Sequence, residues 1–271
     1  MNQAKNILVM MLVVIFLPTL TWATNEKIVL TSGTLPDGGH AYYHELLRES
    51  LNLIGYDLDL KVAELPQKRA EGLLDKNALS IYWFLPTKER DNRGWVKIRF
   101  GLTNGLIGQR VLFIPKGKQN LYNEVRNLDD FRNLGLRGAF GVNWFDVKVW
   151  KQNALNYETV DGDWHVIYGM LAAGNRKIDY FSRGVIEIIA ESKLYPELDI
   201  EKNLMFVYDR DFFFYMNKTD GARYKDIIKK ALIKAKSTGL MDKLLRKHFL
   251  ESIDQIGYKK RLKIKLQKPL E

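Results

Sequence analysis

An arginine suited to binding a carboxylate follows a predicted buried strand. Residues 79–85 are rich in aromatic and β-branched side chains, and the run ends at Pro86, which has no N–H to donate. The next four residues are Thr87, Lys88, Glu89 and Arg90. In open α/β sheets, ligands bind beyond the carboxyl ends of the strands, and a guanidinium suits a carboxylate bidentately. We therefore expect Thr87 and Arg90 to contact a ligand; the alternative is an ion pair of Arg90 with Glu89 or Asp91.

Aromatic side chains of the same strand are further candidates. Tyr82 and Phe84 alternate with Ile81 and Trp83, so each pair faces one side of the sheet. Most of the four are expected to be core. We expect Tyr82 or Trp83 to reach the ligand, where an aromatic face could stack on a planar or cationic group.

A second candidate site is the predicted strand-to-helix turn at residues 143–146, with the sequence Asn-Trp-Phe-Asp. The free N–H groups at a helix start favour an anion. We expect ligand contacts from Asn143, Trp144 and Asp146; the alternative is that Asn143 only caps the helix.

Motifs for other chemistry are nearly absent. There is no G-x-S-x-G motif and no glycine-rich phosphate loop, and the lack of cysteine excludes disulfides, thiolate metal sites and a cysteine nucleophile. His40 and His44 stand four residues apart on a predicted helix, but no third metal ligand is evident. We expect a protein that is not an enzyme and that needs neither a metal nor a cofactor, with a secreted hydrolase or lyase as the alternative.

The elements that must position these residues alternate between strand and helix. We expect a strand at 27–31, a helix at 40–54, a strand at 56–62, a helix from Pro66 and the strand at 79–85. This alternation favours a parallel sheet with right-handed crossovers. The alternation of helices and strands begins again at Leu128, which indicates a second α/β lobe inserted after about residue 112. Extended runs at 204–208 and 211–216 and two amphipathic helices at 224–235 and 241–249 complete the chain.

Residues 1–23 have the layout of a secretory signal peptide. Lys5 precedes an apolar run from Ile7 to Leu20, and cleavage is expected after Ala23. The alternative is an uncleaved anchor, although the run is shorter than the roughly 20 residues of a membrane span. We expect an exported protein of 248 residues after removal of the first 23.

The charge balance favours anionic partners. The formal net charge is +10, which in an exported protein indicates acidic small molecules or acidic surfaces rather than nucleic acid. Residues 256–271 carry several lysines against a single acid, Glu271, and we expect this basic tail to be mobile.

Several motifs, taken in order, resemble those of type 2 periplasmic solute-binding proteins of the family 3 kind, which serve the uptake of amino acids and related polar solutes. They are Pro66-Gln-Lys-Arg-Ala70, Thr87-Lys-Glu-Arg90, Gly105-Leu-Ile-Gly-Gln-Arg-Val111, Gly174-Asn-Arg-Lys-Ile-Asp179, Phe213-Phe-Tyr-Met-Asn-Lys218 and Thr238-Gly-Leu-Met241. The resemblance covers essentially the whole chain after the signal peptide.

This resemblance implies a two-lobed α/β fold, in which each lobe is an open sheet flanked by helices and two hinge strands join the lobes. Lobe 1 would comprise 24–111 and 214–255, lobe 2 would comprise 112–213, and 256–271 would be the tail. The hinges would lie near 110–114 and 212–216, and the lobes would close over a ligand in the cleft. The arginine of the matching T-x-E-R motif clamps the ligand carboxylate in the family, which implies that role for Arg90.

One departure from the family concerns the ammonium group of the ligand. The family's amino-acid binders place an aspartate five residues after the position of Asp179, where this chain has Gly184. Arg183, beside it, would face the cleft instead; the alternative is an ion pair of Arg183 with Glu187.

The sequence therefore predicts a monomeric periplasmic protein that binds a small, carboxylate-bearing, amino-acid-like solute and delivers it to an inner-membrane ABC permease. The alternatives are an accessory protein that reports a ligand to a membrane signalling receptor, and a secreted enzyme on the same scaffold.

Overall fold

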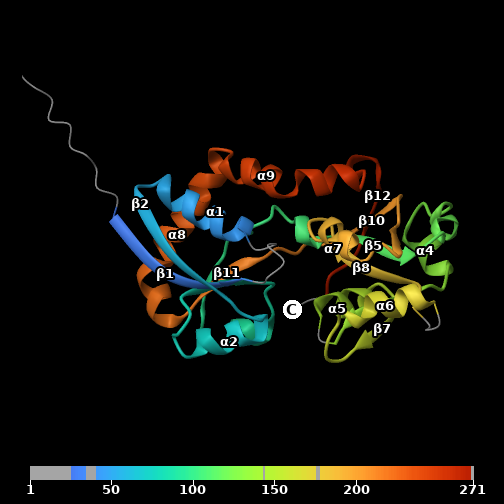
Figure 1. The fold of residues 1–271 in the computed structure, drawn as a ribbon, viewed down its shortest axis with the longest axis horizontal. Coiled ribbons are helices and arrows are strands. Elements are labelled where there is room, and N and C mark those ends of the chain that lie inside the picture. The colour runs from blue at the N-terminus through green and yellow to red at the C-terminus, as the bar shows by residue number, and fades with distance from the viewer. Residues whose placement is uncertain (1–25, 35–40, 143, 175–177, 270–271) are drawn as a thin grey trace, which may run out of the picture.

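The computed structural model describes residues 26–34, 41–142, 144–174 and 178–269, which form two lobes side by side (Figure 1). The predicted signal peptide, residues 1–23, lies outside the described residues. The expected two-lobed α/β fold is confirmed. No helix among the described residues is both long and apolar enough to cross a membrane.

Lobe 1 contains two small sheets and their helices. Its elements are β1 (Glu26–Thr34), α1 (Ala41–Asn52), β2 (Tyr56–Glu64), α2 (Gln67–Asp75), β3 (Ile81–Phe84), α3 (Lys88–Asp91), β4 (Val96–Ile98), β11 (Phe213–Met216) and α8 (Lys218–Ser237). Strands β1 and β2 pair in parallel along their whole length. The expected parallel ladder does not continue into β3. Instead β3 pairs antiparallel with the returning strand β11, which also pairs with β4.

Lobe 2 is built on one mixed sheet in the order β12-β10-β5-β8-β6-β7, with β9 also paired to β5. Its elements are β5 (Gln109–Pro115), η2 (Gln119–Tyr122), α4 (Leu128–Asn133), β6 (Arg137–Gly141), α5 (Phe145–Gln152), β7 (Asn156–Val160), α6 (Val166–Ala173), β8 (Tyr180–Gly184), α7 (Ile188–Leu194), β9 (Leu198–Ile200), β10 (Leu204–Val207) and β12 (Leu262–Lys265). Strand β6 runs parallel to both β7 and β8. The carboxyl ends of these strands therefore meet at one edge of the sheet.

Two crossover segments join the lobes and are bonded to each other. The first runs through 99–108 and includes η1 (Leu106–Gly108), and the second runs through 208–212. The carboxylate of Asp211 accepts the backbone N–H of Thr103 at 2.9 Å and of Gly105 at 2.9 Å, and the hydroxyl of Thr103 at 2.7 Å. Gly108 admits no side chain, because a Cβ there would clash with the backbone carbonyl of Tyr208.

The position of the crossovers corrects the sequence prediction. Residues 110–114 belong to β5 inside the lobe 2 sheet, and 213–216 form β11 inside lobe 1. The expected hinge ranges are therefore mostly paired strand, and the connections lie just before each of them. The family resemblance implied the hinge ranges, but both ranges are extended apolar runs, a pattern that is typical of buried strands.

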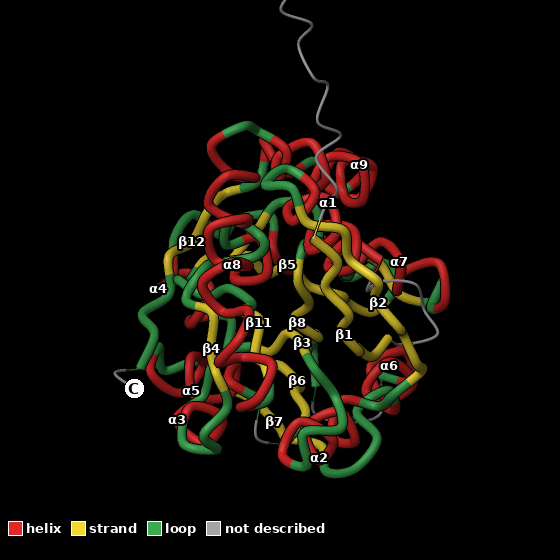
Figure 2. Tube along the Cα trace, turned by 90° about the vertical axis from the view of Figure 1, so that its left-hand side faces the viewer, coloured by secondary structure: helices red, strands yellow, loops and turns green. Residues whose placement is uncertain are grey.

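A third connection replaces the expected mobile tail. Helix α9 (Leu240–Gln255) contacts α1 and α8 in lobe 1 and α7 in lobe 2, and η3 (Tyr258–Lys260) leads into β12. Strand β12 pairs in parallel with β10, from Leu204 opposite Leu262 to Val207 opposite Lys265. Figures 1 and 2 place α9 along one edge of the molecule and α2 at the opposite edge. Residues 262–265 of the basic C-terminal segment are thus part of the lobe 2 sheet.

Candidate ligand-binding groove

A groove of about 440 Å³ lies between the lobes and is the candidate site. Lobe 1 contributes one face of α2, and lobe 2 contributes the loops after β6 and β7. The lining residues are Gln67, Lys68, Glu71, Gly141, Val142, Trp144, Val160, Asp161, Gly162 and Trp164. The lobe 2 wall stands at the carboxyl ends of two parallel strands, where ligands of open α/β sheets bind.

Two tryptophans form the aromatic part of the lobe 2 wall. The rings of Trp144 and Trp164 meet edge to face, with centroids 5.3 Å apart. Trp144 packs so tightly over Gly141 that a Cβ at that glycine would clash with the indole. The backbone N–H of Val142 donates to Val160 at 2.9 Å, which joins the two loops. The wall can therefore offer flat, partly exposed aromatic faces to a bound molecule.

Arg183 supports this wall from behind. Its guanidinium carbon lies 4.8 Å from the Trp164 ring centroid and 5.4 Å from that of Trp144. Its Nε donates to Glu191 at 2.8 Å, and Glu187 lies within 3.4 Å. Although burial opposes its charge, these two carboxylates raise the pKa of Arg183 well above the ordinary value. The ion pair weighed as the alternative is present, and Arg183 does not line the groove.

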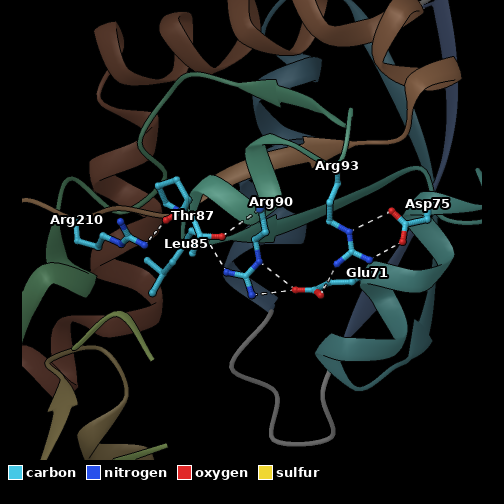
Figure 3. Close-up of polar contacts among 8 residues, drawn as sticks. Glu71, Asp75, Leu85, Thr87, Arg90, Arg93 and Arg210 are labelled. Atoms are coloured by element: carbon cyan, nitrogen blue, oxygen red, sulfur yellow. Dashed lines mark hydrogen bonds and ion pairs between the residues drawn. The ribbon is translucent and has the colours of Figure 1, made fainter. Parts of the chain in front are cut away.

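The lobe 1 wall presents a carboxylate that two arginines already hold (Figure 3). Glu71 Oε1 accepts from Arg90 Nε at 3.0 Å and Nη2 at 2.9 Å, and Oε2 accepts from Arg93 Nη1 at 2.8 Å. Asp75 accepts from Arg93 in turn and from the indole N–H of Trp95 at 2.9 Å. The network contains two cations and two anions, so it presents no net charge to the groove.

Arg90 is thereby positioned next to the groove but not open to it. Its Nη1 donates to the Leu85 carbonyl at 2.8 Å, and its guanidinium carbon lies 4.9 Å from the Phe84 ring centroid. Thr87 caps the short helix α3 by accepting the backbone N–H of Arg90 at 3.2 Å. A ligand carboxylate could reach Arg90 only by sharing it with Glu71 or replacing Glu71.

The expected aromatic contacts from β3 lie in the core. Tyr82 is 2% exposed and Trp83 is 4% exposed, and neither lines the groove. Trp83 stacks on Tyr43 of α1 at 4.4 Å, and Tyr82 packs with the α2 residues Ala70 and Leu74. Helices cover both sides of β3, so alternation brings neither of its faces to the groove.

The residues predicted at the strand-to-helix turn 143–146 do not share one environment. Asp146 is buried, accepts from Tyr208 Oη at 2.9 Å and pairs with Arg110 Nη2 at 3.0 Å. Asn143 lies outside the described residues. Among the predicted ligand contacts that the structure describes, Trp144 is the one that lines the groove.

Sequence reasoning missed the charged groups that face the groove. Lys68 on α2 and Asp161 after β7 are exposed on opposite walls. Within the described part of the chain no ion pair involves either of them. Asp161 could have been found from the sequence, because it stands in the Asp-Gly-Asp loop between a strand and a helix. No pattern in the sequence singled out Lys68, because a lysine on the exposed face of a helix is most often only solvated.

A residue of the second crossover connects the lobes beside the groove. Arg210 donates to the Pro86 carbonyl of lobe 1, and its guanidinium carbon lies 3.5 Å from the Phe145 ring centroid in lobe 2. The described residues contain no cluster of three or more histidine, aspartate or glutamate side chains that could hold a metal ion. His44 has its Nε2 3.1 Å from the Gly33 carbonyl, and His40 lies outside the described residues.

Comparison with solved structures identifies the fold. The probable amino-acid ABC transporter extracellular-binding protein YtmK from Bacillus subtilis aligns with a TM-score of 0.60 at 15% identity, over 82% of this chain and 98% of that one. A putative L-cystine ABC transporter protein from Listeria monocytogenes aligns with a TM-score of 0.52 at 16% identity, over 83% and 96%. An ancestral amino acid-binding protein, described as a precursor of cyclohexadienyl dehydratase, aligns with a TM-score of 0.54 at 13% identity, over 82% and 95%.

These likenesses establish the two-lobed fold of periplasmic solute-binding proteins. Neither a protein-family profile nor a curated protein matches the sequence. The fold is thus shared over most of the chain.

Proposed function

We propose that the protein binds a small polar solute in the groove between its lobes and belongs to the family 3 solute-binding proteins. The observation that carries this proposal is that both lobes line a single groove. Two short crossovers, bonded to each other through Asp211, would allow the lobes to close around a ligand.

The groove favours a solute with an anionic and a cationic end. Lys68 would attract a carboxylate, and Asp161 on the opposite wall would attract an ammonium or guanidinium group. Trp144 and Trp164 would stack on the body of the ligand. Arg90 remains the second proposed carboxylate partner, in competition with Glu71. An amino-acid-like zwitterion meets all of these requirements.

We further propose that the protein is exported to the periplasm, acts as a monomer and delivers its ligand to an inner-membrane ABC permease. A second candidate is an accessory protein that reports the ligand to a membrane signalling receptor. An enzyme on this scaffold is a third, since one structural neighbour is described as the precursor of a dehydratase. Turnover of the bound ligand would distinguish the enzyme, and a neighbouring gene for a permease or for a receptor would distinguish the other two.

A thermal-shift screen of amino acids, dicarboxylates, small peptides and polyamines tests the proposed ligand class. Ligand that binds only the native state raises the free energy of unfolding by RT ln(1 + [L]/Kd), so a saturating hit raises Tm. Lys68→Ala should reduce the shift of a carboxylate-bearing hit. Lys76→Ala is the matched control, because Lys76 is also an exposed lysine beside α2 but does not line the groove. No hit from any class, or equal losses in the two variants, would contradict the proposal.

A further inference from the structure

The net positive charge of this protein comes from the end of the chain. Residues 1–217 contain 26 lysines and arginines against 26 aspartates and glutamates. Residues 218–271 contain 16 against six. The net charge of +10 therefore lies entirely in the last 54 residues, whose described part contains α8, α9, η3 and β12.

Nearly all of these basic side chains are exposed. The exposed ones are Lys218, Arg223, Lys225, Lys229, Lys230, Lys234, Lys236, Lys243, Arg246, Lys247, Lys259, Lys260, Lys263, Lys265 and Lys268. We call these residues the basic face. Within the described part of the chain, ion pairs with acids are recorded for Lys225, Lys247 and Lys268 only.

Helix α8 aligns part of the basic face into a stripe. Lys218, Lys225, Lys229 and Lys236 are separated by seven, four and seven residues, so they lie along one line of a helix with about 3.6 residues per turn. The apolar side of α8 is buried, with Ile228 fully covered. The stripe is therefore held away from the core by the packing of the helix.

The elements that carry the basic face belong to both lobes. Helix α9 runs from the end of α8 in lobe 1 along one edge of the molecule (Figure 1), and β12 pairs with β10 in the lobe 2 sheet. In β12, Leu262 and Ile264 face inward more than the exposed Lys263 and Lys265, as strand alternation requires. The charges are thus fixed on ordered elements rather than on a flexible tail.

The composition of the face indicates the kind of partner. Thirteen of its fifteen residues are lysines, which are strongly hydrated point charges without the planar fork that arginine uses for bidentate recognition. A protein partner would need buried apolar anchors. On these elements Ile233 is the one large apolar residue that is prominently exposed among the described side chains.

We propose that the basic face binds the surface of a membrane rich in anionic phospholipid headgroups, by electrostatic attraction and without insertion. Attraction between exposed charges is screened over about 8 Å at physiological ionic strength, so binding must weaken steeply with salt. The proposal does not depend on the groove having a ligand. The alternative is that the basic face binds an acidic protein, and the test below distinguishes the two partners.

Vesicle co-sedimentation tests the proposal. The probes are phosphatidylcholine vesicles with and without phosphatidylglycerol, at low and high salt. The first variant, Lys225→Glu, Lys229→Glu and Lys236→Glu, reverses three charges of the α8 stripe. The control, Lys76→Glu, Lys118→Glu and Lys151→Glu, makes the same change in net charge at exposed lysines elsewhere. All three proteins share one N-terminus, so any contribution from it cancels.

The wild type should bind the anionic vesicles and not the neutral ones, with at least about a tenfold loss in high salt because the charges are exposed. The stripe variant should lose at least about tenfold in partitioning, while the control stays within about threefold, since the attraction is local. If the stripe variant fails to fold, the corresponding Lys→Gln set replaces it. The proposal is overturned if the wild type does not bind anionic vesicles, or if both variants lose binding equally. Binding of polyglutamate in the absence of vesicle binding would favour the acidic protein partner instead.

Discussion

Glu71 is the side chain through which the groove and the arginine network are coupled, and Glu71→Gln tests that coupling. The carboxylate accepts three hydrogen bonds from two guanidinium groups and is 16% exposed. Hydrogen bonds to charged groups contribute about 1.5–3 kcal/mol each when buried, and partial exposure and the retained amide oxygen reduce that value. We expect the free energy of unfolding to fall by about 1–2 kcal/mol.

The same substitution should strengthen the binding of an anionic ligand. It removes a negative charge from the groove wall and weakens the hold on Arg90, because a neutral amide oxygen accepts from a guanidinium less strongly than a carboxylate oxygen does. Two charges about 6 Å apart interact by about 1–3 kcal/mol at effective dielectric constants of about 20 to 40. The Kd of a carboxylate-bearing hit should therefore fall by about 5- to 150-fold, while that of a purely cationic solute should rise.

Urea denaturation and isothermal titration calorimetry measure the two effects separately. Asp75→Asn is the matched control, because Asp75 belongs to the same network through Arg93 but does not line the groove. It should lower stability by a similar amount and leave Kd within about threefold, since its charge is farther from the ligand. Weaker binding of the anionic hit by Glu71→Gln, or equal changes in Kd for both variants, would refute the proposed competition for Arg90.

Three further predictions concern the crossovers and the buried ion pairs. Gly108→Ala should lower the free energy of unfolding by about 1–3 kcal/mol, because its Cβ meets a backbone carbonyl, whereas Gly72→Ala, with open space in α2, should raise it by about 0.5–1 kcal/mol; thermal melts compare them. Arg261→Met should lower the free energy of unfolding, measured by urea denaturation, by about 3–5 kcal/mol, because the buried carboxylate of Glu201 loses its cationic partner. A loss below about 1 kcal/mol would contradict this. Burial raises the pKa of Glu187, but its polar partners, led by the positive charge of Arg183, together outweigh this and lower it below the ordinary value of 4.5. The ionised carboxylate therefore stabilises the fold above pH 4.5, and this stabilisation is lost as pH falls through the lower pKa of the folded state. Glu187→Gln should flatten that acid limb of stability against pH, and an unchanged slope would count against the assignment.

Local patterns predicted most of the strands and helices and the inserted second lobe, but not the pairing of β3 with β11 or of β12 with β10. The alternation of strands and helices predicted a two-lobed α/β fold with an inserted lobe, and the strand before Pro86 is present as β3. Such patterns work because periodicity reports which face of an element is buried, wherever the element is placed. Trp144, at a strand-to-helix turn, was predicted to face the ligand and does line the groove.

Side-chain partners between distant segments were beyond the reach of the sequence. Arg90 is bound by Glu71, 19 residues away, and the lysine-rich tail is a strand because β10 offers it an open edge. By itself, then, the sequence determined which segments are strands and helices and that they form two lobes. Only the tertiary structure decided which charges neutralise one another and which remain exposed to the groove, because that depends on distances of a few ångströms between elements whose spacing along the chain carries no such information.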